Sequence, residues 1–336
     1  MSHIEKNIPI VTDLDGSLLN IDSTALSMIQ MLKNYPSNYL KAILWLPKGK
    51  YFFKSHIEKY SNIIANQLPY NEVVLKFLKD EKSKGREIYL ATASMQSIAD
   101  KINNHLQIFK GAYGSENNIN LSSSNKLNKL EELFGKYNFD YIGDSNSDLI
   151  IWENANKGYA IKPDKSLSKQ IAKNYKINVF IEKKSSNIKL LIKQLNILKW
   201  TINLLLFLPL AVLNINKNDE IIENLILSFF AISLIDSFLG MKKVLFSIAD
   251  YEFDNYDSKD ILSGELKIFI LLRFMLIILI LSLILMFLLS SNIPILLLFL
   301  YFILGEYFIH SKHKISNSIE IFKIVFKIFI GYYLIK

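Results

Sequence analysis

Residues 11–18 read VTDLDGSL, and the rest of the chain is organised around this stretch. The apolar run 8–11 leads into it, and this run is too short for a helix and predicts a buried strand. Asp13 and Asp15 follow as the strand ends, and Gly16 allows a sharp turn there. Two carboxylates this close repel each other unless a cation or a proton intervenes. The stretch therefore indicates either a catalytic acidic loop or an acidic turn that caps the next helix.

The composition divides the chain into two parts. Its 336 residues are 51 % hydrophobic with a mean hydropathy of +0.22, enough for two domains. Residues 1–185 have the charge of a globular domain, whereas apolar stretches dominate from Leu195 on. The absence of cysteine excludes a disulfide framework and thiolate chemistry. The net charge of +8 comes largely from lysines beside apolar spans, which favours membrane orientation over nucleic-acid binding. The N-terminus shows no signal-peptide pattern.

The N-terminal part alternates between strand and helix patterns. Further strands are expected at 87–91, 112–115, 139–142 and, as the last one, 158–161, with helices between them. This order predicts a parallel, doubly wound α/β sheet. A helical stretch at about 19–68, rich in Tyr and Lys, follows the first strand. We expect it to form an insert over that strand's carboxyl edge, either as a lid or by plain helical packing.

Polar side chains follow these strands at their expected carboxyl ends. Thr92 follows 87–91, and Asp144 and Asp148 follow 139–142. Lys126 opens a helix expected at 127–137. Each has an ordinary explanation by itself, as a helix cap or a solvated residue. Because ligands of doubly wound sheets bind outside the carboxyl ends of the strands, their shared position favours one site.

These motifs, in order over about residues 1–165, resemble those of the haloacid dehalogenase superfamily of phosphotransferases. DLDGS resembles the first motif, with Asp13 as nucleophile and Asp15 as general acid/base. LATAS resembles the second, with Thr92 as its hydroxyl. Lys126 stands where the third motif's lysine is expected, with Lys129 close by. The resemblance implies a Rossmann-like domain at 1–185 with a small helical cap insert at about 19–68.

GDSNSD resembles the fourth motif, with Asp144 and Asp148 as its acidic residues. The resemblance implies an Mg²⁺-dependent phosphatase that forms an aspartyl-phosphate. Mg²⁺ prefers oxygen ligands, and the implied ones come from Asp13, the main chain of Asp15, and Asp144. Asp148 would complete the metal shell or position Lys126.

The remainder, residues 186–336, is expected to form an all-α membrane domain after a basic connector at about 165–195. Five spans are predicted from apolar runs that approach the ~20 residues needed to cross a bilayer, at 200–213, 222–239, 268–289, 293–308 and 319–334. Basic residues gather on one side of these spans, namely Lys193, Lys199, Lys242, Lys243, Lys312 and Lys314. The connections at 214–224 and 290–292 carry little positive charge. The positive-inside rule then predicts an integral membrane protein with a cytoplasmic N-terminal domain.

This half also resembles UbiA-type prenyltransferases, in KWTINLLLFLPL at 199–210 and in the segment 310–334. That resemblance implies a polyprenyl diphosphate held through Mg²⁺ by two Asp-rich loops. The candidate for the first loop carries Asp250, Asp254 and Asp257 at a spacing that departs from the family pattern. It is either a degenerate diphosphate loop or a solvated acidic loop. The second loop would lie beyond residue 336, so a complete prenyl-transfer site is expected to need a second chain.

The sequence favours the first of three functions. The first is a membrane-tethered, Mg²⁺-dependent phosphatase acting on a lipid-linked phosphate ester, such as a polyprenyl-linked phosphosugar. The second is a prenyltransferase with an accessory N-terminal domain, and the third is a non-catalytic membrane scaffold. The expected partners are a phosphorylated substrate, membrane lipid, and a membrane enzyme or a second copy of the chain.

Overall fold

The computed structural model describes residues 8–173, 177–213, 219–253, 256–290, 292–310 and 316–335. The chain divides into two compact units. The first contains Met1–Ser186 together with Ser247–Ile268, and the second contains Asn187–Phe246 and Phe269–Lys336. The segment Ser247–Ile268, which includes Asp250 and Asp257, was expected in the membrane domain. In the structure it belongs to the first unit.

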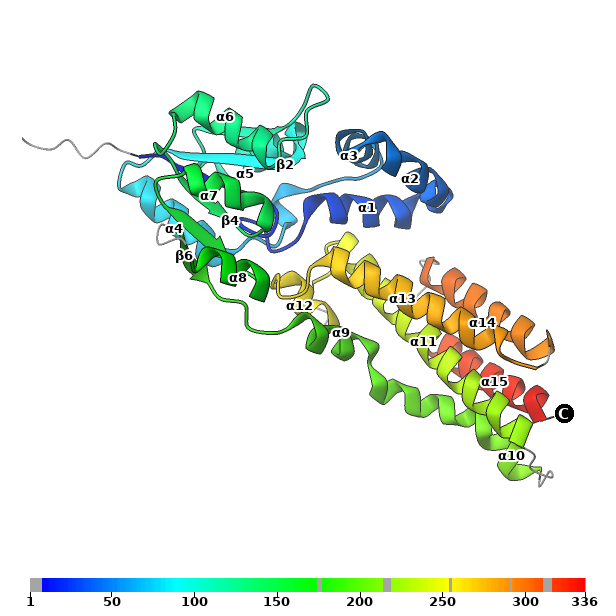
Figure 1. Cartoon of the computed structure of the whole chain (residues 1–336). Helices are drawn as coiled ribbons and strands as arrows, with labels where there is room; N and C mark the ends of the chain where they lie inside the picture. The colour runs from blue at the N-terminus through cyan, green and yellow to red at the C-terminus, as the bar shows by residue number, and fades with distance from the viewer. Residues whose placement is uncertain are drawn as a thin grey trace, which may run out of the picture. The chain divides into compact units, whose positions relative to one another are not determined.

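A six-stranded parallel sheet forms the centre of the first unit, in the order β3-β2-β1-β4-β5-β6 (Figure 1). Its strands are β1 (Ile10–Thr12), β2 (Ile88–Met95), β3 (Gly111–Ser115), β4 (Asp140–Gly143), β5 (Gly158–Ile161) and β6 (Ile177–Ile181). The predicted parallel sheet is confirmed, but the expectation that 158–161 is its last strand is wrong. Because β6 is an edge strand, it keeps exposed positions such as Asn178 and Val179, which hide its apolar pattern within the basic connector.

Helices cover both faces of this sheet. Right-handed crossovers place α4 (Glu72–Ser83) and α5 (Gln96–Leu106) on one face. The opposite face is covered by α6 (Ser124–Phe134), α7 (Leu149–Asn154) and α8 (Lys165–Ile171). The core beneath these three helices includes Leu130, Trp152 and Leu167, with Tyr141 of β4 and Phe139, which directly precedes that strand. This packing holds the carboxyl ends of β1 and β4 rigidly beside each other.

A small helical insert follows β1 and lies beyond the carboxyl edge of the sheet (Figure 1). It contains α1 (Ser23–Asn34), η1 (Pro36–Asn38), α2 (Tyr39–Trp45), η2 (Leu46–Lys48), α3 (Lys50–Glu58) and η3 (Ala65–Gln67). Met31, Ala42 and Ile57 form its own buried cluster. The stretch expected to be helical to about residue 68 has no further α-helix beyond Glu58, where α3 ends. The action of this insert as a cap or lid stays a prediction.

The segment Ser247–Ile268 packs against the insert. Gln30 donates from Nε2 to the carbonyl of Ala249 at 3.0 Å. Tyr251 donates its hydroxyl to the carbonyl of Asn62 at 3.0 Å and accepts the Ile64 N–H at 2.9 Å.

The same segment also packs against the body of the first unit. The Glu265 carboxylate accepts the N–H groups of Lys184 and Ser185 at 3.0 Å each. Ile261 and Leu266 are fully buried. The segment is therefore an integral part of this unit, which also includes η6 (Tyr256–Ser258) and α12 (Lys259–Leu262).

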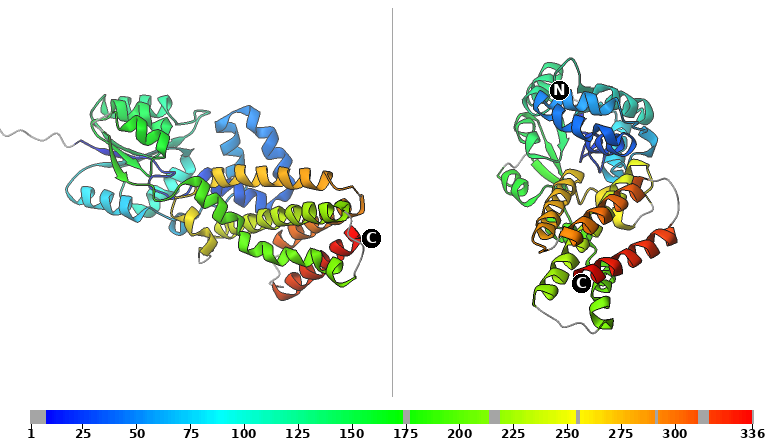
Figure 2. Two further views of the ribbon diagram at one scale, coloured as in Figure 1. Left: turned by 60° about the horizontal axis from the view of Figure 1, so that its bottom comes forward. Right: turned by 90° about the vertical axis from the view of Figure 1, so that its right-hand side faces the viewer.

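The regular elements described in the second unit are all helices. They are α9 (Asn187–Leu195), η5 (Ile197–Phe207), α10 (Leu208–Val212), most of α11 (Asp219–Ala249) and of α13 (Ile268–Phe287), α14 (Asn292–His310) and α15 (Ser316–Ile335) (Figure 2). Among the described residues, four stretches are long and apolar enough to cross a membrane: Asn187–Val212, Asp219–Ala249, Ile268–Phe287 and Asn292–Ile309. The expected fifth span is helical as α15 but is not among them, since Glu320, Lys323 and Lys327 interrupt its apolar run. The count of five spans is therefore not confirmed.

Polar pairs lie inside this helical bundle. Asp236 accepts hydrogen bonds from the Tyr301 hydroxyl at 2.6 Å and from Lys327 Nζ at 2.9 Å. Lys327 is 4 % exposed. Asn203, within the segment 199–210 quoted above, donates to Ser233 at 2.9 Å. Ionisable groups within a membrane span are expensive unless they are paired, and Asp236 in the candidate span Asp219–Ala249 has such partners.

Candidate active site

The pairing of β1 with β4 brings the first and fourth sequence motifs together. Thr12 pairs with Ile142 in the parallel ladder, and the Asp13 N–H donates to the Ile142 carbonyl at 2.9 Å. Both strands end immediately afterwards. The chain therefore delivers Asp13 and the loop that begins at Asp144 to the same point on the carboxyl edge.

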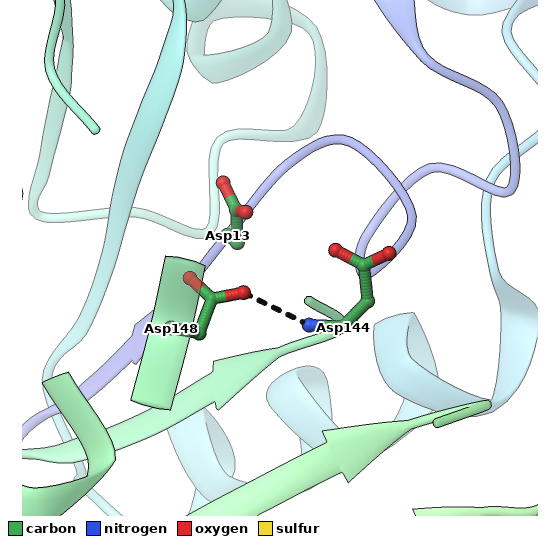
Figure 3. Close-up of side chains that lie close together, drawn as sticks. All are labelled: Asp13, Asp144 and Asp148. Atoms are coloured by element: carbon green, nitrogen blue, oxygen red, sulfur yellow. Dashed lines mark hydrogen bonds between the residues drawn. The ribbon is translucent and has the colours of Figure 1, made fainter. Parts of the chain in front are cut away.

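Three carboxylates gather at this point (Figure 3). Oxygens of Asp13, Asp144 and Asp148 lie within 4.8 Å of one another. Asp13 is 9 % exposed and Asp148 is 1 % exposed. Hard oxygen donors in a compact group are the ligand set that Mg²⁺ prefers. The residues present thus fit the Mg²⁺ implied by the sequence.

Gly16 makes the approach of Asp144 feasible. Its φ of +78° lies in the left-handed region, where glycine is favoured. A Cβ at this position would lie 2.3 Å from Oδ2 of Asp144. The glycine therefore serves both the turn after β1 and the closeness of the two acidic loops.

Lys126 is the lysine that reaches the carboxylates. Its Nζ lies 2.9 Å from Oδ1 of Asp13, and the residue is 2 % exposed. Lys129, the other candidate, pairs with Glu132 on the surface of α6 at 3.4 Å. Lys126 therefore lies on the buried face of α6, whereas Lys129 lies at the edge of that face and is partly exposed.

Tyr141 links Lys126 to Asp148, a role that we did not anticipate from the sequence. Lys126 Nζ donates to the Tyr141 hydroxyl at 2.9 Å, and this hydroxyl donates to Oδ1 of Asp148 at 2.9 Å. The other oxygen of Asp148 accepts the N–H groups of Asp144 at 3.2 Å and Ser145 at 3.0 Å. In this structure Asp148 therefore braces the acidic loop and, through Tyr141, positions Lys126.

Burial and crowding shift the ionisation of this cluster. Desolvation raises the pKa of Asp13 from 3.8 to about 7; Lys126 opposes this rise, and the nearby carboxylates add to it. Burial works to lower the pKa of Lys126, but Asp13 and Asp148 outweigh it, so the pKa is raised. Burial also raises the pKa of Asp144. A buried group of mutually repelling carboxylates is poised to take up a cation.

Asp15 lies on the side of the site where the insert begins. Its Oδ1 accepts the Ser23 N–H at 2.7 Å, at the start of α1, and its Oδ2 accepts the Ser94 hydroxyl at 2.5 Å. Ser94 follows Thr92 by two residues, and its N–H donates to the Thr92 hydroxyl at 3.0 Å. Thr92 is fully buried. Of the two hydroxyls in this motif, that of Ser94 touches Asp15, and this contact was not predicted.

Two further lysines reach the site from distant parts of the chain. Lys54 of α3 donates to the Ala93 carbonyl at 2.6 Å. Burial lowers its pKa, against the opposing effect of Asp15 and Asp22. Lys267 lies 2.6 Å from Oδ2 of Asp144. Neither lysine has a local sequence pattern that marks it, because lysine-rich helices and loops are usually solvated.

The acidic loop singled out in the second half of the sequence lies elsewhere. Asp250 forms an ion pair with Lys33 of α1, which is a contact within the first unit. Asp257 lies in η6, and Asp254 lies outside the described residues. The interpretation of these residues as a diphosphate loop stays a prediction.

No protein family model matches the chain. A curated relative is the uncharacterized protein y4nM of Sinorhizobium fredii, which is 33 % identical over 251 residues. The match covers 74 % of this chain and 48 % of the relative, so the chain spans about half of that protein's length.

Solved structures similar to the chain include haloacid dehalogenase hydrolases. One is a family hydrolase from Salmonella enterica serovar Typhi, with 16 % identity and a TM-score of 0.37, covering 49 % of this chain and 65 % of that one. Another is a probable phosphoserine phosphatase from Vibrio cholerae, with 16 % identity and a TM-score of 0.38, covering 52 % and 62 %. These TM-scores are below 0.5, so the candidate activity rests on the residues of the site. The likeness of the second unit to UbiA-type prenyltransferases stays a prediction.

Proposed function

We propose that the chain is a membrane-tethered, Mg²⁺-dependent phosphatase of the haloacid dehalogenase type. The observation that carries this proposal is the buried pair of Lys126 and Asp13 inside the three-carboxylate cluster. A carboxylate nucleophile and an anionic phosphate repel each other, so their approach requires positive charge close to both groups. Lys126 supplies one part of it, and Mg²⁺ would be held by Asp13, Asp144 and the main-chain carbonyl of Asp15.

The residues then divide the chemistry among them. Bound Mg²⁺ supplies a Lewis acid that offsets the repulsion between nucleophile and phosphate. A carboxylate oxygen of Asp13 attacks phosphorus, the bond from phosphorus to the leaving oxygen breaks, and Asp15 gives this oxygen its proton. Water then attacks the phosphoryl group on Asp13 and passes a proton to Asp15. This step releases phosphate and restores both carboxyl groups.

The positions of the supporting groups agree with these roles. Ser23 and Ser94 hold the two oxygens of Asp15, so its carboxyl group keeps one orientation through both proton transfers. Tyr141 and Asp148 hold Lys126 against Asp13. Thr92 is the residue proposed to bind a phosphoryl oxygen.

We infer that the substrate is a phosphate ester carried on a lipid, such as a polyprenyl-linked phosphosugar. Four candidate membrane spans in the same chain support this inference. The distribution of basic residues around the expected spans supports a cytoplasmic position for the first unit.

The test is phosphate release by the full chain in detergent with Mg²⁺. An aryl phosphate and a polyprenyl-linked phosphosugar are compared as substrates. Asp13→Asn should lower turnover of both about a thousandfold or more, because it removes the nucleophile. Asp100→Asn, at an exposed position of α5, is the control. Equal turnover by the two variants would refute the proposal, and preference for the aryl phosphate would refute the lipid-linked substrate alone.

A further inference from the structure

The outer face of α2 carries large apolar side chains that are exposed. Leu40, Ile43 and Leu44 recur at positions i, i+3 and i+4, which share one face of a helix. They are 73, 62 and 67 % exposed, and Leu46 in η2 is 58 % exposed. Ala42 lies on the inner face and is buried in the core of the insert. The helix is therefore apolar on both sides, but only one side has a partner within the insert.

The charge around this apolar face has a single sign. Residues 23–57 contain five lysines and no aspartate or glutamate. Lys41, Lys48 and Lys50 are exposed beside the apolar face. A short helix with exposed leucines and flanking lysines is typical of segments that lie in the interface of a bilayer. The apolar side chains enter the boundary of headgroups and acyl chains, and the lysines meet anionic headgroups.

The insert makes contacts at the end of a candidate membrane span. The helix α11 has 31 residues, so it is ~46 Å long, whereas the hydrocarbon core of a bilayer is ~30 Å thick. Gln30 of α1 bonds to Ala249, the last residue of α11, and Lys33 pairs with Asp250, the next one. The insert is thus attached directly to the end of a candidate membrane span.

We propose that the exposed face formed by Leu40, Ile43, Leu44 and Leu46 lies in the headgroup region of the bilayer. Lys41, Lys48 and Lys50 bind anionic lipid there. The insert begins at Ser23, whose N–H holds Asp15, so this contact keeps the edge of the candidate site at the membrane surface. The proposal concerns membrane contact and does not depend on the phosphatase activity.

The absence of cysteine allows a direct test with one spin label per chain. The full chain with Leu44→Cys is labelled and placed in nanodiscs of phosphatidylcholine mixed with phosphatidylglycerol. The matched control is Leu133→Cys, near the C-terminal end of α6. Leu133 is 38 % exposed. We expect the label at position 44 to be several-fold less accessible to an aqueous nickel chelate than the control label. It should be more accessible to oxygen, which partitions into lipid.

A second variant separates the binding of anionic lipid by the lysines from the contact of the apolar side chains with the bilayer. Combined Lys41→Gln, Lys48→Gln and Lys50→Gln should restore chelate access at position 44 partly in mixed lipid and little in pure phosphatidylcholine. Equal chelate access at positions 44 and 133 would overturn the proposal. Spin–spin broadening at position 44 that disappears on dilution with unlabelled chain would assign the face to a second copy, and would overturn it as well.

Discussion

The ammonium of Lys267 lies 2.6 Å from Oδ2 of Asp144, although 123 residues separate them in the chain. Burial works to lower the pKa of Lys267, but Asp144 outweighs it, so the pKa is raised. Lys267 directly precedes α13, a candidate membrane span. This ion pair therefore connects the candidate site to the segment that joins two candidate spans, and it places a positive charge on an expected ligand of Mg²⁺.

Removing this charge should strengthen metal binding. We expect Lys267→Ala to tighten Mg²⁺ binding about threefold to fivefold, because a half-exposed ion pair contributes up to about 1 kcal/mol and competes with the cation. Isothermal titration of the full chain in detergent measures this. Lys259→Ala, an exposed lysine of the same segment, should leave the affinity unchanged. Identical affinities for the two variants would show that Lys267 does not compete with the metal.

Tyr141→Phe should lower kcat about tenfold with little change in KM. The substitution removes the hydroxyl that joins Lys126 to Asp148, and hydrogen bonds to charged groups contribute about 1.5–3 kcal/mol. Tyr89→Phe is a suitable control. The Tyr89 hydroxyl donates to Glu87 at 2.9 Å, and both residues lie at the start of β2, away from the carboxyl end of that strand. Steady-state kinetics of both variants test the relay. A loss that appears equally in Tyr89→Phe would indicate a general effect on the sheet.

Gly16→Ala should abolish Mg²⁺ binding and activity, since its Cβ would collide with the Asp144 carboxylate. Gly85→Ala is matched to it, because Gly85 has a φ of +90° with nothing within 4 Å of the added Cβ. Both variants should lose about 1–2 kcal/mol of stability from backbone strain. Thermal unfolding and Mg²⁺ titration separate the two effects. Normal Mg²⁺ binding by Gly16→Ala would show that the acidic loops do not need this approach.

The stability of the metal-free protein should depend on pH through Asp13. Its pKa is raised from 3.8 to about 7, so between these values the folded state holds a proton that the unfolded state has released. The free energy of unfolding therefore falls as the pH rises from about 4 to about 7. Asp13→Asn removes this loss. The Tm of the variant minus the Tm of the natural chain should therefore increase across that pH range and stay constant above it.

Thermal unfolding with EDTA at several pH values tests this expectation. Asp22, whose pKa is also raised to about 7, is present in both proteins, so the difference between them isolates Asp13. A difference in Tm that does not change with pH would mean that Asp13 is ionised throughout.

Much of the site was predictable because it depends on local patterns. Asp13 and Asp144 each follow a short apolar strand, and parallel strands end at one edge of a sheet, so their proximity follows from pattern and topology. Lys126 was preferred over Lys129 on the resemblance to the third motif, since no local pattern distinguishes the two lysines. Their different contacts depend on how α6 packs against the sheet.

The parallel sheet, the acidic residues at its carboxyl edge and the apolar helices of the second half follow from the amino-acid pattern alone. These features arise from periodicity and turn residues that act over a few positions. Three further features became visible in the folded chain: Ser247–Ile268 belongs to the first unit, Lys54 and Lys267 reach the site, and Tyr141 joins Lys126 to Asp148. Such contacts join residues that are distant in the chain or lie on different elements. They depend on the packing of whole helices and strands, which no local pattern of side chains encodes.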